Sequence, residues 1–109
     1  MEKSPFLGIK QLETQVNGIF SSMDVYELDK PQQKIVTAVR RELVDARLDI
    51  RDYELSETRT EQLANAKSAH ARIDTLRKYI LSASEYDIFG AVDVAQLTAQ
   101  LEQIAEYIY

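Results

Sequence analysis

Apolar residues recur every three or four positions along almost the whole chain, which is the spacing of one face of an α-helix. The 109 residues include only three Gly and two Pro. A β-sandwich or barrel needs turn residues about every ten positions, and this sequence does not supply them. We therefore predict an all-α fold, an antiparallel up-down four-helix bundle, in which residues 1–109 form a single domain.

Two helices are predicted in the first half of the chain. The first begins at Ser4-Pro5, a capping residue followed by proline at the first helical position. Its apolar face is formed by Phe6, Ile9, Leu12, Val16, Ile19, Phe20 and Met23. The second helix follows a connection at 24–29 and starts at Asp29, where Gln32 completes a capping box. Its apolar face is formed by Ile35, Val39, Leu43, Ala46, Ile50 and Tyr53.

The second half predicts two more helices. Thr58 and Glu61 form a capping box before the third helix, whose apolar face is Leu63, Ala66, Ala69, Ile73, Leu76, Ile80 and Ala83. The last loop is expected at 84–92, where Tyr86, Ile88 and Phe89 should cover one end of the core. A third capping box, Asp93 and Gln96, predicts the start of the fourth helix, whose apolar face is Val94, Leu97, Leu101, Ile104 and Ile108.

The polar run 54–62 between the second and third helices allows two interpretations. No Gly or Pro forces a break there, so either a turn or one very long helix fits the pattern. We predict the turn, because a chain of this length buries more surface by folding back.

Composition narrows the functional classes. The chain has no Cys, which excludes disulfides and thiolate chemistry. No signal peptide and no apolar stretch of the ~18 residues needed for a membrane span is visible, so we expect a soluble, cytoplasmic protein. The net charge of −5 disfavours tight, non-specific binding to nucleic acid. The acidity is concentrated at 84–109, which holds five acids and no Lys or Arg.

Residues suited to catalysis are few, and we predict no enzyme, no catalytic residue, no cofactor and no metal site. His70 is the only histidine and lies at the edge of the third apolar face, so we expect it to bond to a neighbouring helix. A pH-sensitive contact or a ligand role is the alternative. A di-metal bundle needs Glu-x-x-His pairs, but Lys67 stands three residues before His70. The carboxylates along one flank of the second helix are interpreted as solvated: Glu42, Asp45, Asp49 and Asp52.

The second helix carries a second apolar row outside its core-facing side: Thr37, Val44, Leu48 and Leu55. A helix in a simple bundle needs only one apolar face. The row could pack against another helix of the same monomer, or it could form a subunit interface centred on Val44 and Leu48.

Basic residues on the same helix suggest a contact with nucleic acid or an acidic partner: Lys34, Arg40, Arg47 and Arg51. We expect the four to lie along one side of the helix. They could meet phosphate, with a strong dependence on salt, or they could pair with Glu42, Asp45 or the acids of another subunit.

Three segments carry a resemblance to a known family: Leu43-Val44-Asp45-Ala46-Arg47, AKSAHARIDTLRKYIL at 66–81 and LTAQLEQIAEYIY at 97–109. From Ile9 to Ile108 the chain resembles the four-helix-bundle family that includes the accessory variability determinant proteins of diversity-generating retroelements. Related members are encoded within intervening sequences of bacterial large-subunit rRNA genes. The similarity consists of apolar spacing and helix order.

This resemblance implies a homo-oligomer, a pentameric ring of bundles, that assembles with a reverse transcriptase and with RNA or DNA. Family members present strongly basic surfaces and commonly carry a Trp near the end of the last helix, whereas this chain is acidic and has no Trp. We therefore predict a non-enzymatic, oligomeric accessory protein. The alternative is an acidic adaptor or inhibitor, of phage or defence origin, that binds a basic protein surface through residues 84–109.

Overall fold

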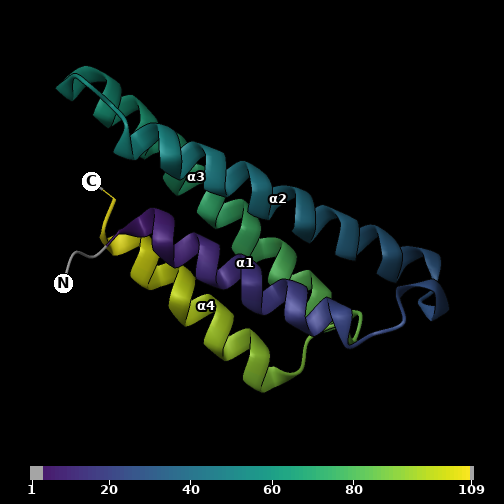
Figure 1. Ribbon diagram of the computed structural model, residues 1–109. Helices are drawn as coiled ribbons and strands as arrows, with labels where there is room; N and C mark the ends of the chain where they lie inside the picture. The colour runs from purple at the N-terminus through teal and green to yellow at the C-terminus, as the bar shows by residue number, and fades with distance from the viewer. Residues whose placement is uncertain (1–3, 109) are drawn as a thin grey trace.

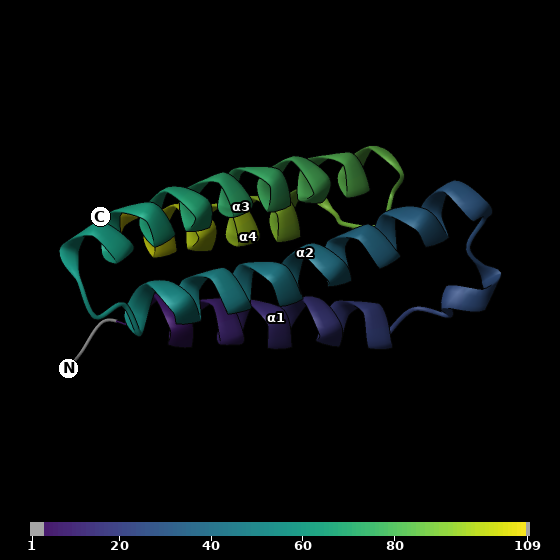
Figure 2. The same cartoon turned by 90° about the horizontal axis from the view of Figure 1, so that it is seen from above.

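The computed structural model describes residues 4–108, and these form an all-α up-down bundle of four helices (Figure 1). The helices are α1 (Pro5–Ser21), α2 (Lys30–Glu54), α3 (Arg59–Glu85) and α4 (Ala91–Glu106), with a short 3₁₀ helix, η1 (Val25–Glu27), between α1 and α2. Each helix packs against its two neighbours in the cycle α1–α2–α3–α4. α2 and α3 are longer than α1 and α4 and run alongside each other (Figure 2).

Side-chain caps set most of the helix starts. Ser4 accepts a hydrogen bond from the Leu7 amide, and Pro5 follows it. Asp29 and Gln32 form the complete capping box that the sequence predicts. Thr58 accepts from the Glu61 amide, and the run 54–62 contains the predicted turn. These caps satisfy amides that the first helical turn leaves without partners.

The predicted start of α4 is wrong. The helix begins at Ala91 with Gly90 as its N-cap, so Asp93 lies inside the first turn and is not the cap. The reason is the end of α3, where Asp87 adopts a left-handed conformation (φ 62°) and the Ile88 amide donates to the Ala83 carbonyl. This C-terminal motif turns the chain at once, and the next helix follows after five residues.

One core of buried side chains runs through the bundle. It contains the predicted apolar faces with a few exceptions. Val36 is fully buried, whereas Ile35 is only partly buried, so the core face of α2 begins one residue later than expected. Ile88 and Phe89 cover one end of the core as predicted, with Phe89 stacked on Phe20 at 5.6 Å, but Tyr86 is exposed.

Leu63 was expected in the core and is half exposed. It lies in the first turns of α3, seven residues before His70. The His70 ring meets the carbonyl of Ile108, just after α4 ends. Within residues 4–108, α4 therefore stops level with His70 and does not reach Leu63.

Gly8 and Gly18 give a matched test of packing within α1. A Cβ added at Gly8 would lie 2.9 Å from Cγ1 of Ile104, whereas a Cβ at Gly18 would meet nothing within 4 Å. We expect Gly8→Ala to destabilise the protein by about 1 kcal/mol, because overpacking outweighs the gain in helix propensity. Gly18→Ala should stabilise it by about as much. Thermal unfolding followed by circular dichroism measures both, and a rise in Tm for Gly8→Ala would contradict the close α1–α4 contact.

Candidate functional site

The face of α2 that points away from the core is the candidate interaction surface. We call Thr37, Val44, Leu48 and Leu55 the outer row. Val44 is 39% exposed, Leu48 is 37% exposed and Leu55 is 69% exposed, and Thr37 is exposed as well. The row therefore stays in contact with solvent in the monomer. Packing against another helix of the same chain, one of the two interpretations of the sequence, does not cover it.

Both flanks of the outer row are occupied by contacts to neighbouring helices. On the α1 side, Arg47 Nη1 lies 2.9 Å from Glu13 Oε1, and the Arg40 guanidinium lies 5.2 Å from the centre of the Phe20 ring. On the α3 side, Arg72 reaches the carboxylates of α2. The row is therefore an apolar strip between two sets of charged contacts.

Three of the four carboxylates on the acidic flank of α2 contact Arg72, contrary to the sequence interpretation, whereas the fourth, Asp52, is exposed as expected. Arg72 lies 3.0 Å from Glu42, 3.1 Å from Asp49 and 3.7 Å from Asp45, and the Glu42 side chain is only 13% exposed. The hydrogen bond to Glu42, and then the one to Asp49, raises the pKa of the Arg72 guanidinium above its ordinary value. The cationic form of Arg72 is therefore stabilised, and Arg72 is charged throughout the working pH range.

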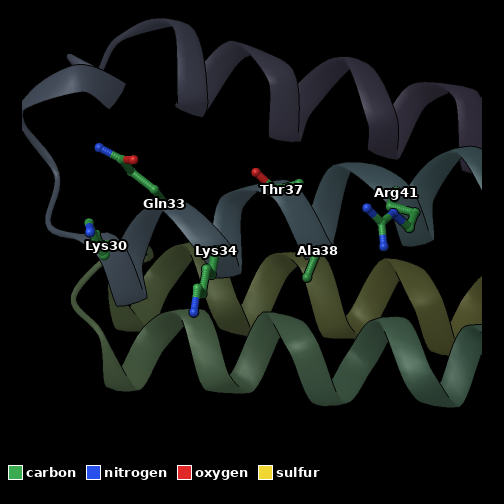
Figure 3. Close-up of a pocket in the computed structure, with 6 residues that line it drawn as sticks. All are labelled: Lys30, Gln33, Lys34, Thr37, Ala38 and Arg41. Carbon is green, nitrogen blue, oxygen red and sulfur yellow. The ribbon is translucent and has the colours of Figure 1, made fainter.

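The four predicted basic residues do not share one environment. Arg40 and Arg47 face α1, and Arg51 lies 3.7 Å from Asp52. Lys34 lines a hollow together with Thr37 and Arg41 (Figure 3). The alternative, that these arginines pair with Glu42 or Asp45, is wrong within the chain, because Arg72 of α3 contacts both carboxylates.

Lys34 belongs instead to a hollow on the N-terminal half of α2. The hollow measures about 420 Å³ and its walls are formed by Lys30, Gln33, Lys34, Thr37, Ala38 and Arg41 (Figure 3). Gln33 is held by the carbonyls of Val25 and Leu28. A second hollow of about 400 Å³ shares Lys30 and Lys34 and extends to Tyr79 and Tyr86.

His70 lies where the sequence places it. Its Nε2 is 2.8 Å from the carbonyl oxygen of Ile108, so the ring donates a hydrogen bond and ties the end of the bundle to α3. Among residues 4–108, no group of three or more His, Cys, Asp or Glu is arranged to hold a metal ion. No helix in this range is long and apolar enough to cross a membrane.

Two contacts of this site were missed in the sequence, Glu13 with Arg47 and Arg72 with the acidic flank. Arg72 directly precedes the core residue Ile73, which places it beside the apolar face of α3. An arginine beside one apolar face and a carboxylate stripe beside another were the available signal. The signal does not say which helices are neighbours, and the pairing depends on that.

Replacing Arg72 tests the α2–α3 contact. Arg72→Met leaves three neighbouring carboxylates without their cation, and we expect a loss of about 1–2 kcal/mol, since a third of the side chain is exposed to solvent. The loss should shrink at 1 M salt, where repulsion between the carboxylates is screened. Urea unfolding measures the loss of stability, and Arg77→Met, at an exposed position of α3, is the control. Equal effects of the two substitutions would refute the role of Arg72.

Comparison with known proteins gives no match, because no family model, no curated protein and no solved structure is significantly similar to this chain.

Proposed function

We propose that this chain is a non-enzymatic assembly protein whose copies associate through the outer row of α2. The observation that carries the proposal is the exposure of Val44 and Leu48, one helical turn apart on the outside of a bundle whose core is already complete. Covering these apolar side chains with a partner removes them from water, which favours association.

The contacts of the polar residues support binding over catalysis. Arg72 binds the carboxylates of the acidic flank, Arg47 is held by Glu13, and His70 donates to a backbone carbonyl. A catalytic group needs a free position beside a substrate. Here the groups that could act in catalysis are engaged in contacts that fix the positions of the helices.

The resemblance to the retroelement accessory family supplies the proposed partners. An up-down bundle of four helices is compatible with that family, and membership would bring a reverse transcriptase and nucleic acid to the assembly. These partners are proposed from the similarity in apolar spacing and helix order. The assembly through α2 rests on the exposed row and stands without them.

The second candidate function is an acidic adaptor, and a different surface favours it. Helix α4 carries three acids and no Lys or Arg, and its Glu102 and Glu106 are exposed. Glu85 and Asp87 are also exposed just before it. Such a surface attracts a basic partner, for example the cleft of a nuclease or a polymerase.

Two aspartates in the outer row test the assembly. We expect Val44→Asp combined with Leu48→Asp to reduce the mass in light scattering to that of a monomer, because an interface would bury charges without partners, at several kcal/mol. Helicity should persist, since both side chains are already exposed in the single chain.

The matched control places the same charges elsewhere. Leu63→Asp combined with Leu81→Asp changes two leucines of similar exposure on α3, and this variant should keep its oligomeric mass. A natural protein that is monomeric at high concentration would end the proposal, and so would a control that dissociates as readily as the outer-row variant.

The arginines of α2 test the nucleic-acid role. Because Arg40 and Arg47 are engaged with α1, we expect binding of RNA or single-stranded DNA to be weak at low salt and lost at physiological salt. Replacing Arg40, Arg47 and Arg51 by Ala should abolish it without a change in oligomeric mass. A control with the same net charge replaces Arg59, Arg77 and Lys78. If the natural protein binds nothing at low salt, the adaptor function takes precedence.

A further inference from the structure

The hollow between α2 and α3 is a second feature of the surface, separate from the outer row. It measures about 400 Å³, and residues of both helices line it. Pro31, Ile35 and Ala38 contribute from α2, and Tyr79 and Tyr86 contribute from α3. Apart from two lysines, the lining of this hollow is therefore apolar or aromatic.

Contacts between α2 and α3 bound the hollow at both ends. At one end, Gln32 Nε2 donates a hydrogen bond of 2.8 Å to the carbonyl of Tyr86. At the other end, Glu42 binds Arg72 at 3.0 Å. Tyr79 and Tyr86 are seven residues apart, which is about 10 Å along α3. A hollow of this length accommodates a small molecule and not an extended segment of a polymer.

The two lysines give the hollow a positive charge. Lys30 and Lys34 line it, and no Asp or Glu of residues 4–108 does. Among the same residues, neither ammonium group has a hydrogen bond or an ion pair. Of the nearby acids, Asp29 caps the start of α2, while Glu85 and Asp87 are exposed to solvent, where water and salt screen their charge. The charge of the lining therefore favours an anion.

The tyrosines narrow the ligand further. Tyr86 is 43% exposed. Tyr79 is partly buried and packs against the core while it also lines the hollow. Tyrosine rings are favourable partners for other flat aromatic rings, nucleobases included. Two tyrosines beside two unpaired lysines thus match a ligand that has both a ring and an anionic group.

We propose that this hollow binds a small anion that carries an aromatic ring, which is the chemistry of a nucleoside phosphate. The anionic group lies at Lys30 and Lys34, one helical turn apart, and the ring packs against Tyr79 and Tyr86. The hollow lies apart from the outer row, so this inference goes beyond the proposed assembly and does not depend on it.

A dye of the same chemistry tests the site. Anilinonaphthalene sulfonate joins an aromatic body to one anionic group, and its fluorescence rises in apolar surroundings. We expect the protein to bind the dye and adenosine monophosphate to displace it. Adenosine and inorganic phosphate each carry half of the required chemistry and should displace it about tenfold less well or worse.

The alternative results of this titration are decisive. Dye that adenosine monophosphate does not displace would overturn the inference, and so would equal displacement by adenosine or by phosphate alone. A single-stranded oligonucleotide that displaces the dye at lower nucleotide concentration than adenosine monophosphate would support the same chemistry, with nucleic acid as its source.

Substitution of the lysines tests the anionic contact. Lys30→Gln with Lys34→Gln should weaken binding of the dye and of adenosine monophosphate by about tenfold or more, because both cations of the hollow are lost. The control is Lys10→Gln with Lys67→Gln, which changes the net charge equally at exposed positions that do not line the hollow. Equal losses in the two variants would show a general effect of charge and overturn the site.

Filling the hollow separates it from the outer row. Ala38→Leu puts a larger side chain into the hollow without a change of charge, and we expect a loss of about tenfold or more in affinity. Ala64→Leu, at an exposed position of α3, should bind normally, and so should Val44→Asp with Leu48→Asp. Circular dichroism checks that each variant folds. Binding that survives Ala38→Leu and is lost with the two aspartates would place the dye on the outer row and overturn the inference.

Discussion

The packing of α2 against α3 is the contact on which the rest of the bundle depends. These are the two longest helices, and each contributes an apolar face to the core and a charged flank to their shared edge. Arg72 bonds to Glu42 and Asp49, more than one turn of α2 apart, and so fixes how far one helix slides along the other. Apolar packing alone specifies such a position less sharply, since a one-turn shift still covers an apolar face.

With α2 and α3 fixed, the remaining contacts close the bundle. Arg47 bonds to Glu13 of α1, Gly8 lets α1 approach α4 at Ile104, and His70 ties the chain after α4 back to α3. Each of these polar contacts lies at the edge of the core and none within it, so no charge has to be fully buried. The outer side of α2 is left without a partner, and this is why its apolar row carries the functional proposal.

The proposed association rests on the side chains of that outer side. Arg47 and the acidic flank beside it are already engaged within the monomer, while Val44, Leu48 and Leu55 remain exposed. An apolar row bordered by satisfied charges can be covered without leaving buried groups unpaired.

The sequence by itself determined the four helices, their order and most of their buried residues. A period of 3.6 in the apolar pattern and caps such as Asp29 with Gln32 are local properties, which neighbouring residues fix. Only the tertiary structure decided which charges pair. Arg72 bonds to carboxylates that lie 23 to 30 residues earlier in the chain. Lys34 lines the hollow and does not lie beside Arg40 and Arg47. The start of α4 and the exposure of Leu63 were decided in the same way, because they depend on where a neighbouring helix ends.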